Sequence, residues 1–152
     1  MQKVLDWASQ NPVEAVIACG DYCAPFIGSY LKEINVPTYA CLGNNDEDHI
    51  GLQKQAGENV TWFHLSQEYG EVELDGKKIA FCHYPRLAEL LAQSGDYDAV
   101  FHGHTHKVRN EVVGRTLLVN PGSICGIVNA KPAQASFGVY DTVENNVEII
   151  EL

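Results

Sequence analysis

Five short segments of this sequence carry side chains that bind metal ions or phosphate groups, and each follows an apolar run. The segments are Gly20-Asp21, Gly43-Asn44-Asn45-Asp46, His83, Gly103-His104-Thr105-His106 and Asn120-Pro121-Gly122-Ser123. An aspartate can bridge two divalent cations, an asparagine offers a neutral carbonyl oxygen, and a histidine offers an imidazole nitrogen. Such a mixed nitrogen and oxygen set suits Mn, Fe, Zn, Ni or Co better than Ca, which prefers oxygen ligands alone. The residue types therefore indicate a transition-metal site.

Each segment taken alone also has an ordinary structural explanation. An Asp after a Gly is usually a turn or a helix cap, and a lone His at a strand end is more often a hydrogen-bonded structural residue than a ligand. Asn-Asn-Asp and Asn-Pro-Gly-Ser are common loop and turn sequences. The ordered presence of all five segments is what favours a metal site over these alternatives.

The predicted elements place the segments at the ends of strands. Apolar runs predict strands over 15–19 and 38–42 with a helix over 25–34 between them, an order typical of a parallel sheet. The strand over 15–19 is expected to be buried on both faces, and a first helix is expected to begin almost at the start of the chain. In open α/β sheets, functional groups lie in the loops beyond the carboxyl ends of the strands.

The pattern changes to hairpins after Gly57. Further strands are predicted over 60–63, 68–74, 77–81, 99–101, 108–113, 116–119, 136–140 and 147–150, with a helix over 85–93. Asp75-Gly76, Gly114-Arg115 and Asn145-Asn146 supply tight turns. His104 and His106, two residues apart in what we expect to be an extended segment, would project to the same side. The fold class is α/β with mixed, layered sheets.

The composition limits the partners of the chain. Twenty acidic residues against ten basic ones give a net charge of −10, which argues against broad nucleic-acid binding and against an anionic membrane surface. No apolar run approaches the roughly 18 to 20 residues of a membrane span, and the N-terminal segment lacks the pattern of a signal peptide. The five cysteines are scattered without a CxxC pair, so we expect reduced thiols in a cytoplasmic protein. A length of 152 residues predicts one domain over 1–152.

The ordered set of segments resembles the motifs of the calcineurin-like metallophosphoesterases, above all their small single-domain bacterial and archaeal phosphodiesterase branch. The resemblance covers nearly the whole chain. It implies a four-layer α/β/β/α sandwich of two mixed sheets and a site for two divalent metals, with Mn foremost and Zn, Fe, Ni or Co as alternatives. It also implies metal-assisted hydrolysis of a small phosphorylated substrate, above all a phosphodiester.

The resemblance assigns five metal ligands. Asp21 resembles the aspartate that bridges both metals, and Asn44 resembles the asparagine that binds the second metal and contacts the substrate phosphate. His83 and His104 resemble the other ligands of the second metal. His106 resembles a ligand of the first metal.

Further residues are assigned to catalysis and to the substrate. Asp46 resembles the acidic residue that supports the catalytic loop. Asn45 stands where many larger relatives carry a histidine that serves as a proton donor; an amide cannot donate a proton at neutral pH, so good leaving groups such as aryl alcohols are expected. Asn45 and Arg86 are the candidates for contact with the substrate, although a solvated helix start explains Arg86 equally well. His102 is a candidate for another proton donor, although a strand residue that faces sheet or helix is the favoured explanation. We expect His49 and His64 to be structural or surface residues.

The sequence departs from the family pattern at its start. The family begins with a strand that ends in Asp-x-His and binds the first metal, and this segment is missing here. Only Asp21 and His106 remain as ligands of the first metal, whereas the second metal keeps all four of its ligands. Either the chain is incomplete at Met1, or the protein is a one-metal or metal-free relative. We favour the first explanation, because loss of a buried parallel strand exposes backbone groups and apolar surface. A partner or a second copy would cover the gap, so a homo-oligomer is expected.

Two classes of function therefore compete. The first is a metal-dependent phosphodiesterase or phosphatase, which the retained ligand set favours. The second is a protein-binding module, because the implied fold is similar to that of the retromer subunit that uses a phosphoesterase scaffold to hold other proteins; the missing strand favours this reading. A cysteine-based phosphatase is excluded, because the sequence contains no Cys-x5-Arg loop.

Overall fold

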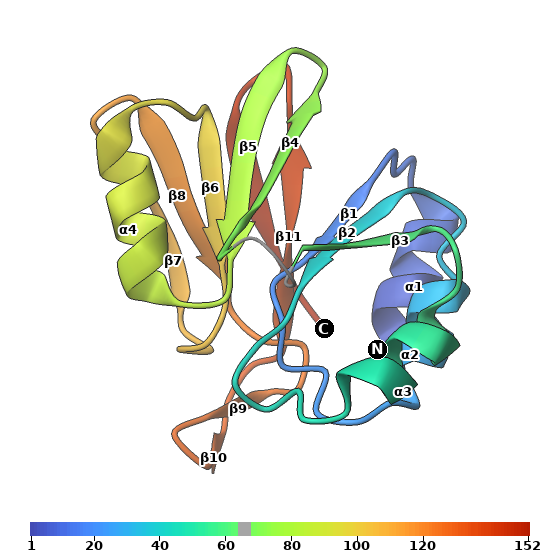
Figure 1. The fold of residues 1–152 in the computed structure, drawn as a ribbon. Helices are drawn as coiled ribbons and strands as arrows, with labels where there is room; N and C mark the ends of the chain where they lie inside the picture. Colours follow the sequence, from blue (N-terminus) through green and yellow to red (C-terminus); the bar gives the residue numbers. More distant parts are fainter. Residues whose placement is uncertain (64–67) are drawn as a thin grey trace. The chain divides into compact units, whose positions relative to one another are not determined.

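A computed structural model describes residues 1–63 and 68–152 of the chain. These residues form two compact units, 1–70 and 71–152, and each is described by itself (Figure 1). The elements of the first unit are α1 (Gln2–Gln10), β1 (Val16–Ala18), α2 (Ile27–Lys32), β2 (Thr38–Cys41), α3 (His49–Ala56) and β3 (Val60–Phe63). Those that follow are β4 (Gly70–Leu74), β5 (Lys77–Cys82), α4 (Pro85–Ser94), β6 (Ala99–His102), β7 (Val108–Val113), β8 (Thr116–Pro121), β9 (Ile127–Val128), β10 (Lys131–Pro132), β11 (Ser136–Asp141) and β12 (Asn146–Glu151).

The first unit is built on a three-stranded parallel sheet of order β1-β2-β3. Helices α2 and α3 pack against each other, and their apolar residues form a core with the sheet that includes Leu31, Ala40 and Leu52. Gly28 makes this close packing possible, because a Cβ at this position would lie only 2.6 Å from the backbone oxygen of Leu52. The loops that leave β1 and β2 emerge at the same end of the sheet, as expected for parallel strands.

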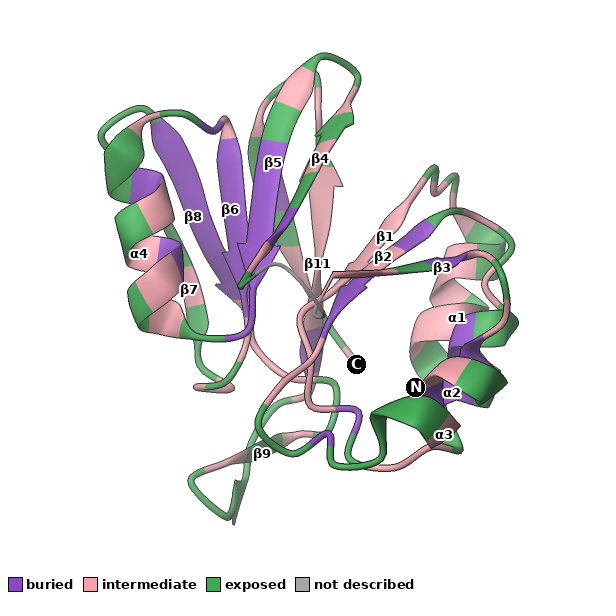
Figure 2. Ribbon diagram, in the orientation of Figure 1, coloured by how far each residue is buried: buried purple, intermediate pink, exposed green. Residues whose placement is uncertain are grey.

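The second unit contains a five-stranded mixed sheet of order β4-β5-β6-β8-β7. Its central strands β6 and β8 are buried at almost every residue, because α4 packs against them and the β11–β12 hairpin also contacts β8 (Figure 2). The ring of Phe101 contacts Tyr140 of β11, with centroids 5.3 Å apart. Because side chains alternate along a strand, Val100 and His102 face the opposite side of the sheet, toward α4.

The structure confirms most of the predicted elements and corrects some of them. The Asp75-Gly76 turn has the left-handed φ values of +51° and +73° that a two-residue hairpin requires. The strand expected over 15–19 is wrong in its burial: β1 spans three residues, lies at the edge of its sheet and is only partly buried. Helix α3 was not predicted, although Asp48 caps it by accepting a hydrogen bond from the Gly51 N–H at 2.8 Å. The short β9–β10 hairpin was also not predicted.

Helix length and hydropathy also bear on membrane insertion. No helix in the described residues combines the length and the apolar character needed to cross a lipid bilayer.

Candidate metal and phosphate site

Asp46 organises the two loops that follow β1 and β2. Its side chain is buried, with only 5% of the residue exposed, and it accepts hydrogen bonds from three backbone N–H groups. The N–H groups of Asp21 and Gly43 donate to Oδ2 at 2.8 and 2.7 Å, and the N–H of Cys23 donates to Oδ1 at 2.9 Å. Hydrogen bonds to an ionised carboxylate are stronger than neutral ones. Asp46 is therefore a positioning residue that ties one loop to the other.

Asp21 is held in place by the second loop. Both of its carboxylate oxygens accept hydrogen bonds from Asn45, one from the backbone N–H and one from the side-chain amide, each at 2.9 Å. Asp21 has a φ of +64° and Cys23 a φ of +67°, which non-glycine residues seldom adopt and which cluster at functional sites. Position 20 requires a glycine, because a Cβ there would lie 2.5 Å from the backbone nitrogen of Gly43.

Asn44 lies at the surface of the same loop. It is exposed, as is its neighbour Asn45, whereas Asp46 is buried beneath them. The sequence-predicted residues of the first unit therefore lie in two joined loops: a half-buried carboxylate and two exposed amides, with a second, buried carboxylate supporting the loops.

His83 and His104 are adjacent in the second unit. His83 follows β5 and is buried, and His104 follows β6 and is exposed. The ring nitrogens Nε2 of His83 and Nδ1 of His104 lie 3.2 Å apart. Two nitrogen ligands of a tetrahedral metal ion lie about 3.3 Å apart when each bond measures 2.0–2.1 Å. The separation therefore suits either a direct hydrogen bond or a shared metal ion.

His106 makes a different contact from His104. Its Nδ1 lies 2.7 Å from the carbonyl oxygen of Ile127. A carbonyl only accepts, so Nδ1 carries the proton and the Nε2 lone pair of the neutral ring is available to a ligand, as in many metal-binding histidines. The expected extended segment is wrong: His104 and His106 have φ values of +67° and +57°, so they do not alternate as in a strand.

Cys125 lies beside His106 and was not predicted as part of any site. Its Sγ is 3.9 Å from Nδ1 of His106 and 3.0 Å from Oγ of Ser123, and the residue is exposed. No spacing rule links residues 19 positions apart, so only the fold could reveal this neighbour. Of the five cysteines, only Cys41 and Cys82 are buried.

Asn120 holds the loop that carries the histidines. It is fully buried, and its amide donates to the carbonyl oxygen of Gly103 at 2.8 Å and to Oγ1 of Thr105 at 3.0 Å. Its Oδ1 accepts from the N–H of Gly122 at 3.0 Å. Asn120 therefore joins the segment 103–106 to the turn after β8, which explains why both motifs occur in one sequence.

His102 is a structural residue, as expected. It is 1% exposed, and burial lowers the pKa of its imidazole from the ordinary value of 6.5. Its Nδ1 lies 3.1 Å from the carbonyl oxygen of Gly103, and its buried Nε2 has no hydrogen-bond partner among the described residues. A neutral, buried ring is poorly placed to donate a proton to a substrate.

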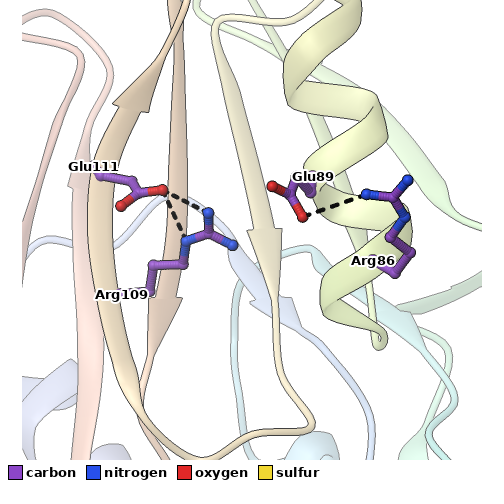
Figure 3. Close-up of polar contacts among 4 residues, drawn as sticks. All are labelled: Arg86, Glu89, Arg109 and Glu111. Carbon is purple, nitrogen blue, oxygen red and sulfur yellow. Dashed lines mark hydrogen bonds and ion pairs between the residues drawn. The ribbon is translucent and has the colours of Figure 1, made fainter.

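Arg86 lies in the first turn of α4 and extends from the surface. Its guanidinium pairs with Glu89 one turn later, at 3.7 Å, and its side chain is 75% exposed (Figure 3). The other pair in that view, Arg109 and Glu111, joins two side chains of β7. His49 is exposed at the start of α3, in agreement with a surface role. His64 lies outside the described residues.

The five predicted metal ligands are divided between the units. Asp21 and Asn44 belong to residues 1–70, and His83, His104 and His106 belong to residues 71–152. Among the described residues, no group of three or more His, Cys, Asp or Glu side chains is arranged to hold a metal ion. The chemistry of the donors nevertheless fits a divalent transition metal, because two imidazole nitrogens face each other and a carboxylate is fixed by its neighbours.

Comparisons with known proteins identify relatives of the whole chain. Residues 1–145 match a family described as the calcineurin-like phosphoesterase superfamily domain. Phosphodiesterase MJ0936 of Methanocaldococcus jannaschii is 30% identical over an alignment that covers the whole of this chain and 90% of that protein. A solved structure of an archaeal phosphodiesterase is 29% identical, with a TM-score of 0.86, and covers 99% of this chain and 90% of its own.

The fold is also similar to that of Vps29. The structure of a double mutant of Vps29 from Entamoeba histolytica has a TM-score of 0.68 at 18% identity, covering 100% of this chain and 88% of that one. At this level of identity the likeness concerns the fold alone.

Proposed function

The chain belongs to the calcineurin-like phosphoesterase superfamily, and from this premise we propose which of its residues perform the hydrolysis. The protein is a metal-dependent phosphoesterase, and its similarity to an archaeal phosphodiesterase makes phosphodiester hydrolysis its reaction. We assign Asp21, Asn44, His83, His104 and His106 as the metal ligands. The observation that carries this assignment is the 3.2 Å separation between the ring nitrogens of His83 and His104.

The metal requirement follows from the family, and the details are our proposal. Mn is the metal that we propose first, with Zn, Fe, Ni and Co as alternatives for the same nitrogen and oxygen donors. We propose one complete site, which uses Asp21, Asn44, His83 and His104. This complete site is that of the second metal, and for the first metal we assign Asp21 and His106 as ligands.

The other residues of the site have separate proposed roles toward the substrate and the loops. When bound, a divalent metal polarises phosphoryl oxygens and makes a water molecule more acidic. Asn44, exposed on its loop, would contact the substrate phosphate, and Asn45 would both hold Asp21 and face the substrate. Asp46 would keep this loop in register with the loop of Asp21. Arg86 would reach the phosphate only by leaving Glu89, an exposed pair that is held weakly.

The substrate, the partners and the location of the protein are also part of the proposal. A small phosphorylated molecule is the substrate, since the curated relative is a phosphodiesterase. We propose that residues 1–152 work as a single phosphoesterase domain, which the family match over 1–145 supports. A net charge of −10 argues against broad nucleic-acid binding and membrane binding. The five cysteines, all within the described residues, form no disulfide, which favours the cytoplasm, and assembly as a homo-oligomer is expected.

Metal analysis tests the ligand assignment. The purified chain, reconstituted with Mn or Zn and freed of excess metal, should retain close to one equivalent of metal, measured by mass spectrometry. His104→Ala should retain much less, because it removes one of two facing imidazole nitrogens. Full retention in that variant, or none in the natural chain with its fold intact, would contradict the proposal.

Activity tests the reaction itself. His104→Ala should abolish the hydrolysis of bis(4-nitrophenyl) phosphate, which the metal-loaded natural chain should cleave. His49→Ala is the matched control, because it removes an exposed imidazole at the start of α3. Unchanged turnover in His104→Ala would place the reaction elsewhere.

A protein-binding function is the second candidate, favoured by the fold shared with Vps29. It predicts a folded chain that neither retains metal nor hydrolyses phosphodiesters. The two experiments above separate the candidates, because only the phosphoesterase requires His104 for both readouts.

A further inference from the structure

Tyr84 has an aromatic ring at the proposed phosphate site that the fold does not require. It stands between His83 and the first residue of α4, in extended conformation with φ −89° and ψ 133°. Its ring centroid lies 5.0 Å from that of His83, at an interplanar angle of 80°, and 5.1 Å from that of His104, at 57°. The three rings form a cluster, because His83 and His104 are themselves 5.0 Å apart.

The exposure of this ring distinguishes it from a core residue. Tyr84 is 48% exposed, whereas the residues directly before it, Cys82 and His83, are 1% and 3% exposed. Its structural contribution comes from the backbone, since its carbonyl oxygen accepts from the N–H of Ala88 at 3.2 Å and from Sγ of Cys82 at 3.4 Å. Any residue would supply that carbonyl. An exposed aromatic ring beside two candidate ligands is therefore available to a bound molecule.

We propose that Tyr84 determines substrate specificity by stacking on an aromatic group that is esterified to the phosphate. This inference rests on the proposed function, because that function makes His83 and His104 ligands of the metal that would polarise the phosphate. The Tyr84 ring lies about 5 Å from each of the two imidazole rings. An aryl ester puts its ring one oxygen atom from phosphorus, so a phosphate at a metal held by these imidazoles would bring the aryl ring close to Tyr84. The substrate class is phosphodiesters that carry an aryl group or a nucleobase.

A second feature points to the same class of substrate. The side-chain amide of Asn45 donates to Asp21 and carries no acidic proton, so the leaving group receives no proton from this position. Aromatic alcohols leave more readily without protonation than alkyl alcohols. Both features favour aryl esters, whereas a nucleotide, whose leaving group is a sugar hydroxyl, would gain only from the ring of Tyr84.

Binding of simple phosphate monoesters tests the proposal without reliance on turnover. The Mn-reconstituted full chain is titrated with methyl phosphate, phenyl phosphate and thymidine 5′-monophosphate by calorimetry. We expect phenyl phosphate to bind about three- to tenfold more tightly than methyl phosphate, because a single aromatic contact strengthens binding by about this factor. Tyr84→Leu should reduce this ratio toward one, whereas Tyr84→Phe should keep it. Thymidine 5′-monophosphate shows whether a nucleobase, one sugar farther from the phosphate, gains from the same ring.

The controls separate this inference from the proposed function. Leu90→Ala changes an equally exposed residue, also 48% exposed, in α4, the helix that Tyr84 precedes, and should leave the ratio unchanged. Equal weakening of methyl and phenyl phosphate in both Tyr84 variants, or no change in either, would overturn the role of Tyr84. If the natural chain binds phenyl phosphate selectively but hydrolyses no diester, the proposed function fails and this inference stands. If no monoester binds, this inference fails, and the hydrolysis of bis(4-nitrophenyl) phosphate decides the proposed function separately.

Discussion

The two halves of the proposed site are supported by different means. In residues 1–70, a single buried carboxylate, Asp46, gathers three backbone N–H groups and so fixes the loops of Asp21 and Asn44. In residues 71–152, the histidines follow strands of a buried sheet, and a neutral amide, Asn120, holds their loop. One half depends on charge and the other on burial.

This difference determines how easily a single substitution disrupts each half. Charge-assisted hydrogen bonds to Asp46 are strong, but all of them are lost together when one residue changes. In the second half, β6 and β8 are buried on both faces, so the positions of the histidines follow from many small contacts (Figure 2). The half rich in oxygen ligands should therefore be the easier one to disrupt by a point substitution.

Asp46→Ala should have the largest effect. Three backbone N–H groups lose a buried carboxylate acceptor, so we expect the first unit to lose about 3 kcal/mol of stability. Both tryptophans of the chain, Trp7 and Trp62, lie in residues 1–70, so their fluorescence during urea unfolding reports on this unit. Asp48→Ala is the control, because it removes a carboxylate that only caps α3 and should lose about 1 kcal/mol. Equal losses in the two variants would refute the special role of Asp46.

Asn120→Ala should have the next largest effect. It removes two donated hydrogen bonds and one accepted one at a fully buried position, for an expected loss of about 2 kcal/mol. Amide hydrogen exchange should accelerate at residues 103–106 and 122. Asn110→Ala, which removes a single bond to the carbonyl of Val147 at 2.9 Å, should leave those amides protected. Unchanged exchange in Asn120→Ala would show that burial alone holds the loop.

Alkaline pH should destabilise the second unit through Tyr140. Burial, with Asp98 and Asp141 nearby, raises the pKa of this phenol from 10.0 to about 12. Between these values the unfolded chain releases the proton while the folded chain keeps it, so the stability present below pH 10 is lost as the pH rises toward 12. The loss should be about 1 kcal/mol, since the ring is only partly buried. Urea unfolding at pH 9 and pH 11 should show a smaller difference in Tyr140→Phe; the same difference in both chains would rule this out.

Ala130→Gly should have the smallest effect, a gain in stability. Ala130 has a φ of +60° in the β9–β10 turn, a conformation that glycine adopts without strain. The gain should be about 0.5 kcal/mol after the greater freedom of glycine in the unfolded chain is subtracted. Ala133→Gly is the matched control at a residue without positive φ, and it should lower the melting temperature instead. A lower melting temperature in both variants would contradict the strain at Ala130.

The strands and the tight turn at Asp75-Gly76 could be read from the sequence, because alternation and turn chemistry are local. The prediction for β1 failed in burial because an apolar run does not reveal how many neighbours a strand has. Helix α3 was missed although Asp48 was a readable cap, since Gly51 interrupts an otherwise helical segment. Cys125 beside His106 could not be predicted, because the two residues meet only through the fold.

The chemistry of the candidate ligands can be inferred from the residue types and their order along the chain. The residue types at Asp21, Asn44, His83, His104 and His106, and their order after apolar runs, indicate a transition-metal site, and their resemblance to the family motifs implies a metal-dependent phosphoesterase. How these side chains are oriented and supported is visible only in the folded chain. The left-handed backbone at His104 and His106, the three N–H groups on Asp46 and the exposed ring of Tyr84 against two imidazoles arise from residues brought together across long stretches of chain. Donor chemistry is a property of single residues, whereas orientation and exposure depend on neighbours that only folding supplies.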